Sequence, residues 1–561
     1  MSGFSGIYIF DQQQSAKLKS FIFPENLHGF YPLRYELQND CFSLRCYNNG
    51  KFFRDGHVFA STNNIVGFDG INLSGSNLEG TKSLEDFVSK VGEIKGTFSC
   101  FYIDRQARKV CLFADKTGAH QIFYYRNASF FAFSSSIFLL IDILRHFGVE
   151  PTVSVFSSYM MLSLGYLMED YTLVSEIRKV CGGHYITADT DGLSNQKYHD
   201  YYRKTQYTRL TDDLIEEIDA RFKKSIKLEY GKDSEYGFSH VATLSGGLDS
   251  RLNVMLANKT GYKDITCVTF SEGFKSDEMT ARKITHDSGM KHIVFLLNGG
   301  FPLYDIETPL ILNNCAVYYF GSAQTLASVK RINFSGYGLF HNGILAESSK
   351  GSYLSGRRHK VPSIDRHFRI SEKTFEKLDK GALDNIFDKY QNDEMFMTYN
   401  RGFNAAHNGS WVTMPFTDSV YTYMENDFAD LAYSVDPQLR FAAYLTIEWM
   451  NHKNPETANY VWQRDVKPTN NAIKKFRARV IYRLKLSMSQ KRDIAAPISE
   501  WYHASEDLRT FIAYQFNHSH AFDVVPVEIQ KDLKELFSSD SIDEKLLCLS
   551  YMKSIELLFI R

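Results

Sequence analysis

The sequence has almost no net charge. Its 64 Lys and Arg residues are balanced by 65 Asp and Glu residues, which gives a formal net charge of −1. Such a balance provides no global electrostatic attraction for nucleic acid or for an anionic membrane surface. We therefore expect neither nucleic acid nor a membrane as a partner, and any site for an anionic ligand must be local.

Paired cysteines and long apolar runs are also missing. The eight cysteines are scattered, without the CxxC spacing that zinc sites and redox pairs use. No run reaches the roughly 18 to 20 continuous apolar residues of a membrane helix. The N-terminus lacks a basic stretch followed by an apolar run, so no secretory signal is predicted. The expected location is the cytoplasm, where the cysteines would be reduced and buried.

The chain of 561 residues exceeds what one hydrophobic core usually supports, so more than one domain is expected. Residues 1–200 alternate short β-forming runs with turn residues, which predicts layered antiparallel sheets with few helices. In residues 201–561, strands first alternate with helices, which predicts a parallel sheet, and beyond residue 365 the pattern is mainly helical. The first-half strands are predicted at 6–10, 96–103, 109–113, 121–125 and 130–134.

A glycine-rich turn joins a predicted strand at 240–244 to a predicted helix at 250–258. Glycines let backbone N–H groups converge on one point, and the helix N-terminus adds partial positive charge. This arrangement predicts a site for the phosphates of ATP. The residues expected to form it are Leu244, Ser245, Gly246, Gly247, Leu248, Asp249 and Ser250.

Three side chains of this turn suit the same ligand. Ser245 and Ser250 can donate hydroxyl hydrogen bonds to phosphate oxygens, and Asp249 can hold a Mg²⁺ that neutralises a departing pyrophosphate. The plain alternative is an ordinary glycine-rich turn capped by Asp or Ser. We favour the phosphate site because strand, glycines, Asp, Ser and helix follow one another in the required order.

The SGGLDS segment at 245–250 resembles the ATP-pyrophosphatase loop of the asparagine synthetase family, whose pattern is SGGxDS. Two further stretches are similar to that family. The TFS run that starts at Thr269, followed by the acidic pair at 277–278, looks like its second strand and next helix start, and WVTMPFTD at 411–418 looks like its VPFLD element. The resemblance implies ATP and Mg²⁺ as cofactors and adds Thr269 to the nucleotide site.

Four stretches near the N-terminus resemble class II glutamine amidotransferase domains. They are similar to that family's MCGIxGI, RDxxGxxPLYY, FASE and IxKLPPGHY patterns and lie at 1–7, 114–124, 131–135 and 177–185. The combined resemblance implies a fold in two parts. Residues 1–200 would form an α+β Ntn-hydrolase-like sandwich, and residues 201–561 an α/β parallel-sheet ATP-pyrophosphatase domain with a helical C-terminal region.

The chain departs from the family at its second acidic motif, SGEGADE. The best counterpart is GILAE, in which Glu347 replaces the metal-binding Asp and Ile344 replaces the catalytic Glu. A competing alignment at 335–338 would put Phe340 at the metal position, and Phe cannot ligate Mg²⁺. We therefore expect Asp249 and Glu347 to hold the metal together and to be the catalytic residues, with a substrate other than aspartate.

Two more expectations follow from the resemblance. Family members use a basic residue late in the chain to neutralise pyrophosphate, and Arg464 and Lys467 are the nearest candidates. Ser2 stands at the position of the glutaminase nucleophile, which is a Cys in active members, and Asp69-Gly70-Ile71 stands where they have NGE. The glutaminase-like domain is therefore predicted to be inactive, so nitrogen would come from ammonia or an amine.

Together these resemblances imply an AMP-forming carbon–nitrogen ligase that adenylates a small-molecule carboxylate, such as a sugar acid, and transfers nitrogen to it. Adenylation is needed because a free carboxylate is a poor electrophile. Two alternatives stay open: an intramolecular cyclase similar to β-lactam synthetases and lasso-peptide cyclases, and a non-catalytic relic that binds nucleotide. Assembly as a homodimer is also left open.

Overall fold

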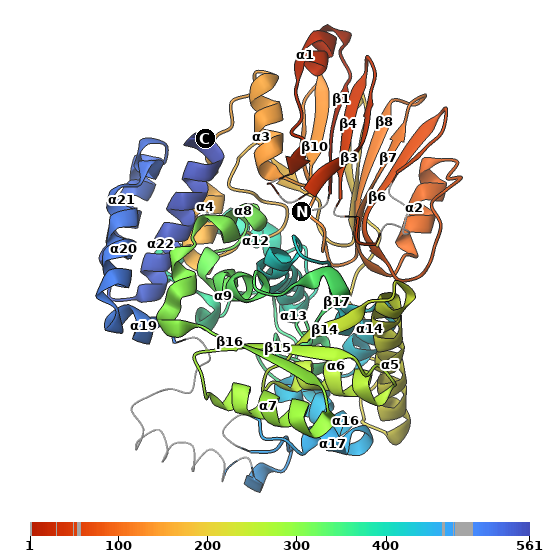
Figure 1. Ribbon diagram of the computed structural model, residues 1–561. Helices are drawn as coiled ribbons and strands as arrows, with labels where there is room; N and C mark the ends of the chain where they lie inside the picture. Colours follow the sequence, from red (N-terminus) through yellow and green to blue (C-terminus); the bar gives the residue numbers. More distant parts are fainter. Residues whose placement is uncertain are drawn as a thin grey trace.

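The computed structural model describes residues 3–27, 29, 31–48, 50–52, 58–462, 466–474, 476 and 497–560. Ser2 and Arg464, two of the residues singled out above, lie outside the described residues. Figure 1 shows two antiparallel sheets, a separate parallel sheet and a group of C-terminal helices. None of the described helices is both long and apolar enough to cross a membrane.

The N-terminal part contains two facing antiparallel sheets. In the described residues the first sheet has the order β11-β9-β10-β1-β4-β3-β2, formed by Arg178–Lys179, Phe123–Arg126, Phe130–Ser134, Gly3–Ile9, Phe42–Tyr47, Tyr31–Gln38 and Asn26–Leu27. The second has the order β13-β12-β8-β7-β6-β5, formed by Leu193–Lys197, His184–Ala188, Lys109–Ala114, Gly96–Asp104, Asn64–Asn72 and Val58–Ala60. Phe4 of β1 and Phe101 of β7 meet between the sheets with ring centroids 4.8 Å apart.

Helices cover the outer faces of this pair of sheets. On the first sheet, Ile7 of β1 belongs to the same apolar cluster as Leu140 of α3 (Ile137–His146). On the second sheet, Phe87 and Val91 of α2 (Leu84–Gly92) share an apolar cluster with Phe98 of β7. The N-terminal part is thus a four-layer α/β/β/α structure.

The parallel sheet has the order β16-β15-β14-β17-β18 in the described residues, with every neighbouring pair parallel. Its strands are Lys291–Leu296, Ile265–Ser271, Ser239–Thr243, Tyr337–Asn342 and Ser419–Tyr421. One face packs against α5 (Asp212–Glu235), α6 (Leu248–Lys259), α7 (Ser276–Ser288), α14 (Asn426–Ser434) and α16 (Tyr444–Lys453). The other face packs against α9 (Tyr319–Val329) and η7 (Asn408–Thr413).

The C-terminal helices lie beside the N-terminal part (Figure 1). They are α19 (Ile498–Ala504), α20 (Glu506–Asn517), α21 (Val527–Ser538) and α22 (Ile542–Ile555). Residues of α20, α21 and α22 share one apolar cluster with α3 and with α4 (Val155–Leu164). Residues far apart in the sequence therefore form one continuous core.

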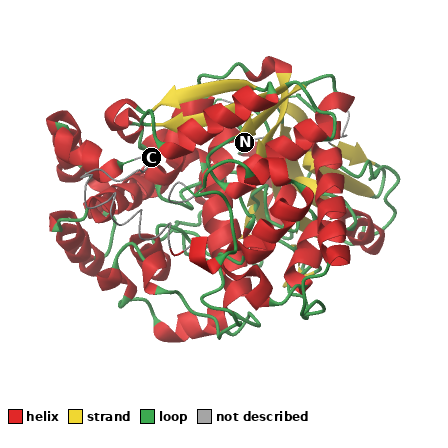
Figure 2. Ribbon diagram, turned by 90° about the horizontal axis from the view of Figure 1, so that it is seen from below, coloured by secondary structure: helices red, strands yellow, loops and turns green. Residues whose placement is uncertain are grey.

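Shorter helices complete the helical regions that dominate the view from below in Figure 2. They are α1 (Ser15–Ser20), α8 (Glu307–Leu312), α10 (Glu347–Lys350), α11 (Glu372–Phe375), α12 (Lys380–Phe387), α13 (Asp393–Met397), α15 (Pro437–Arg440) and α17 (Pro455–Ala458). The predicted order of antiparallel sheets, parallel sheet and helical C-terminal region is confirmed for the described residues.

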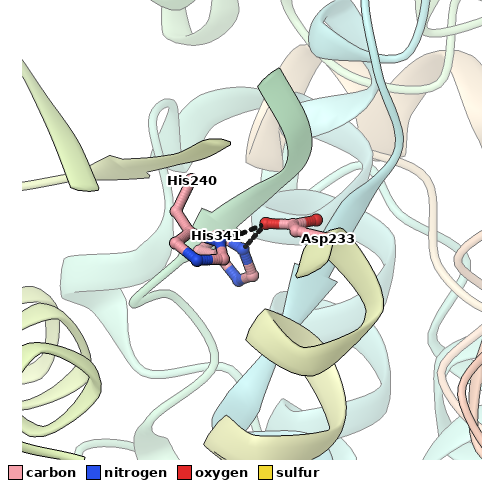
Figure 3. A group of neighbouring side chains, drawn as sticks. All are labelled: Asp233, His240 and His341. Carbon is pink, nitrogen blue, oxygen red and sulfur yellow. Dashed lines mark hydrogen bonds and ion pairs between the residues drawn. The ribbon is translucent and has the colours of Figure 1, made fainter. Parts of the chain in front are cut away.

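A buried carboxylate joins α5 to two strands of the parallel sheet (Figure 3). Oδ2 of Asp233 lies 2.8 Å from Nδ1 of His240 on β14 and 2.8 Å from Nε2 of His341 on β17. Its other oxygen accepts a hydrogen bond from the N–H of Leu339. Burial lowers the pKa of His341, but Asp233 and Glu229 outweigh burial and raise that pKa to about 9. His341 is therefore charged at neutral pH and is part of what fixes α5 on the sheet.

We predict that the free energy of unfolding falls as pH rises through about 9. A group whose folded-state pKa is raised stabilises the fold fully below its unfolded value of 6.5 and loses that effect above its folded value. His341→Gln should lower stability and flatten this part of the pH profile, measured by urea unfolding over a pH range that spans both values. His286→Gln, at an exposed histidine of α7, should leave the profile unchanged. An unaltered profile in the His341 variant would contradict the assignment.

Candidate active site

The glycine-rich turn lies between β14 and α6, at the carboxyl end of the central strand of the parallel sheet. Ser250 Oγ accepts a hydrogen bond from the N–H of Ser245 at 3.0 Å, and Ser245 Oγ accepts one from the N–H of Gly247 at 3.0 Å. A Cβ added to Gly246 would lie 2.3 Å from Oδ1 of Asp277, so only glycine fits there. Open α/β sheets bind ligands at this edge.

The fully buried side chain of Arg251 forms hydrogen bonds with the glycine-rich turn. Nε of Arg251 donates to the carbonyl of Gly247 at 3.1 Å, and its guanidinium also donates to the carbonyl of Gly246. The same group donates to the carbonyls of Tyr460 at 3.0 Å and Val461 at 2.7 Å. Burial lowers the pKa of Arg251 to about 10, so the side chain stays charged at neutral pH. The conformation of the turn thus depends on a segment 210 residues further along the chain.

Asp249 and Glu347 line the same cavity, with Lys350 beside them. Nζ of Lys350 lies 2.5 Å from Oδ2 of Asp249. Oδ1 of Asp249 and Oε2 of Glu347 are buried and have no hydrogen-bond partner among the residues that the structure describes. Burial raises the pKa of both carboxyl groups, and the negative charge of Asp249 raises that of Glu347 further. Burial of two neighbouring carboxylates, one of which raises the pKa of the other, favours a cation at this site.

A cavity of about 450 Å³ opens next to the turn. Of the predicted site residues, it is lined by Leu244, Ser245, Gly247, Asp249, Ser250, Thr269 and Glu347. Thr269 donates to the carbonyl of Leu244 at 2.6 Å and so ties β15 to the start of the turn. Strands β14, β15 and β17 thereby bring together residues that are far apart in the sequence.

Three predicted residues do not line this cavity in the described part of the chain. Gly246 and Leu248 belong to the turn but are not among its lining residues. Lys467 is exposed, and its Nζ lies 3.3 Å from Oδ1 of Asn459. The structure therefore gives no support to Lys467 as a ligand of pyrophosphate.

Lys350 and Arg251 were not anticipated as site residues. Arg251 directly follows the SGGLDS segment, but its partners are backbone carbonyls, which leave no trace in side-chain identity. Lys350 stands three residues after Glu347 on the short helix α10, and this spacing puts both side chains on one face. That spacing was the available signal.

Two of the sequence motifs meet where the N-terminal part contacts the parallel sheet. Nε1 of Trp411 donates to the carbonyl of Ala119 at 2.8 Å. The ring of His120 lies between two carboxylates, with Nδ1 3.0 Å from Asp69 and Nε2 3.4 Å from Asp418. Burial lowers the pKa of His120, but the two carboxylates raise it above its ordinary value. Segments 114–124 and 411–418 are therefore in direct contact.

The described residues contain one group of three potential metal ligands close enough to hold an ion, formed by Asp233, His240 and His341. Their ligand atoms lie within 4.8 Å of one another. Both rings, however, already approach Asp233 at the hydrogen-bond distance of 2.8 Å. We therefore assign this group to the packing of α5. The unpartnered oxygens of Asp249 and Glu347 are better suited to a metal, because hard cations such as Mg²⁺ prefer carboxylate oxygens.

Comparison with protein families matches residues 85–199 to a glutamine amidotransferase domain. The matched residues run from α2 to just beyond the end of β13, so they cover neither the glycine-rich turn nor the cavity. No curated protein matches the chain. The part of the chain from 85 to 199 is thus similar to a glutamine amidotransferase domain.

Three solved structures are similar to parts of the chain. The allosteric regulatory enzyme of purine biosynthesis is 9% identical, with 52% of this chain and 80% of that chain covered and a TM-score of 0.20. Glutamine phosphoribosylpyrophosphate amidotransferase from B. subtilis is 9% identical, with 52% of this chain and 80% of that chain covered and a TM-score of 0.21. NMN synthetase from Francisella tularensis is 15% identical, with 39% of this chain and 95% of that chain covered and a TM-score of 0.19. At these TM-scores the likenesses carry no argument about the function of this chain.

We predict that Arg251→Met lowers the free energy of unfolding by about 3 kcal/mol or more. Hydrogen bonds from a charged group contribute about 1.5–3 kcal/mol each, and the loss would leave buried carbonyls unpaired. Urea unfolding measures this loss. The matched control is Arg282→Met, at a half-exposed arginine of α7 paired with Glu278. Equal effects of the two substitutions would show that Arg251 has no special role.

Proposed function

We propose that the protein is an ATP-dependent amide-forming ligase. It adenylates a carboxylate, releasing pyrophosphate, and a nitrogen nucleophile then displaces AMP. One observation carries this proposal: Ser245, Asp249 and Ser250 line the same cavity as Glu347, at the carboxyl ends of parallel strands. The amidotransferase-like segment at 85–199 is consistent with an amide-forming reaction.

The backbone around Glu347 supports its alignment with the metal-binding Asp of the SGEGADE pattern. Leu345 has a φ of 62°, in the left-handed region that glycine adopts most readily, and the pattern has a glycine at this position. A Cβ added to Gly343 would lie 2.7 Å from the N of Ser250, and the pattern has a glycine there too. The conformation that the pattern requires is therefore present, although a leucine has replaced one of its glycines.

Mg²⁺ fits this site because two buried carboxylate oxygens, on Asp249 and Glu347, have no partner in the described structure. When bound, the ion would neutralise the charge of the phosphates. Side chains and backbone groups of the chain would bind the phosphates. The hydroxyl groups of Ser245 and Ser250 can donate hydrogen bonds to phosphate oxygens, and the N-terminus of α6 adds partial positive charge.

The cavity supports an acid other than aspartate. Ile344 lines it where the aspartate-amidating family has a glutamate. The other apolar residues that line the cavity include Val268, Phe270, Val329 and Phe340. No Lys, Arg or His is among the described lining residues. Among the described lining residues, a second carboxylate on the substrate would find no positively charged partner. We therefore propose a monocarboxylic acid without a second negative charge as the substrate class.

We predict that the protein exchanges labelled pyrophosphate into ATP in the presence of its acid, and that Asp249→Asn abolishes this exchange while the protein stays folded. The assay should be run over a panel of acids that includes aspartate, which should support little or no exchange. Asp191→Asn, in an exposed turn, is the control. Release of ADP and phosphate in place of AMP and pyrophosphate would overturn the proposed reaction.

We also predict that the protein does not hydrolyse glutamine. Glutaminase chemistry of this kind needs an activated N-terminal thiolate, and the chain has Ser2 in its place. In addition, Asp69 is buried and already bonded to His120, so it is not free to bind the amino group of glutamine. Glutamate release should be absent with the natural sequence and also with Ser2→Cys. Release by the natural protein would contradict the prediction.

A further inference from the structure

Among the described residues, the lining of the cavity carries more negative than positive charge. Asp249 and Glu347 line it, whereas none of the described lining residues is basic. A triphosphate bound at the turn would bring more negative charge into the same space. Mutual repulsion of like charges in a partly buried site is costly, so the site needs cations besides the helix N-terminus.

Lys350 is the cation paired with the carboxylate at the centre of this site. Its Nζ contacts Oδ2 of Asp249 at 2.5 Å, and its side chain is 23% exposed. The helix α10, which carries it, also carries Glu347. The carboxylate of Asp249, at this distance, pairs with the ammonium form of Lys350.

The bond between Lys350 and Asp249 would weaken if Asp249 held a metal ion. The ammonium group contacts Oδ2 and the unpartnered oxygen is Oδ1, and two cations on one carboxylate repel each other. The ammonium group is carried by a flexible chain of four methylene groups, so it can turn away without moving α10. A phosphate oxygen bound at the turn could then be its new partner.

We propose that Lys350 is the residue that neutralises the leaving pyrophosphate, and that its bond to Asp249 is the resting state of the nucleotide-free site. This inference rests on the proposed function. Lys350 takes the role that the sequence alone suggested for Arg464 or Lys467, of which Lys467 is exposed and contacts Asn459. When the nucleotide binds, Lys350 leaves Asp249 and contacts the pyrophosphate group.

The bonds made and broken in the reaction step balance. A carboxylate oxygen of the acid attacks the α-phosphorus of ATP and forms the acyl–phosphate bond. The bond between the α-phosphorus and the bridging oxygen breaks, and pyrophosphate leaves with that electron pair. Lys350 stays protonated throughout and donates hydrogen bonds to the oxygens that gain charge, which stabilises the leaving group.

The test measures two binding equilibria of the full chain that require no turnover. In Lys350→Met, inorganic pyrophosphate should bind about tenfold more weakly, the factor expected from one charge-assisted hydrogen bond. Mn²⁺ alone, followed by electron paramagnetic resonance, should bind more tightly because the competing ammonium is gone. Lys350→Arg should retain pyrophosphate binding. Lys291→Met, which removes an exposed lysine paired with Asp264, should change neither equilibrium.

A purely structural role for Lys350 would weaken both equilibria or neither, and either result would overturn the proposal. A second measurement uses the unmodified protein, in case Lys350→Met does not fold. Pyrophosphate should slow acetylation of Lys350 by an amine-reactive reagent, whereas Mn²⁺ should accelerate it, as read by mass spectrometry of the peptide. Absence of protection by pyrophosphate would also overturn the proposal. Failure of pyrophosphate exchange with intact pyrophosphate binding would instead refute only the adenylation reaction.

Discussion

The site depends on one buried guanidinium. Arg251 is fully enclosed and binds carbonyls of the glycine-rich turn on one side and of residues 460–461 on the other. Glycines give the turn its freedom, and that same freedom would let it collapse or open without a partner to hold it. A charged group with several fixed donors removes this freedom in a way that a lysine could not. Residues 460–461, which follow α16, therefore help to fix the conformation of the glycine-rich turn, although the two segments are far apart in the sequence.

The N-terminal part is joined to the rest by polar contacts as well as by packing. His120 between Asp69 and Asp418, and Lys95 with Glu425 and Asp427, link the second antiparallel sheet to the segment around β18. These contacts hold the second antiparallel sheet against the parallel sheet.

The sequence allowed much of this arrangement to be predicted, for physical reasons that differ from residue to residue. The strand at 240–244 and the turn after it were predictable because a buried β run, two glycines and a helix start follow one another locally. Glu347 could be placed through its pattern. The spacing of Lys350 after Glu347 was a signal, but its pairing with Asp249, 101 residues away, could not be predicted from it. Lys467 was chosen for its charge and its place late in the chain, and its side chain is exposed in the structure.

The shared core of α3, α4 and α20 to α22 has a consequence for synthesis of the chain. The apolar sides of α3 and α4 leave the ribosome early, whereas the helices that cover them are made last. Until then a broad apolar surface on the N-terminal part stays in contact with water, a condition that promotes aggregation. A nascent or truncated chain would need a chaperone at this surface, and the amidotransferase-like part expressed alone would require redesign of these two helices to remain monomeric.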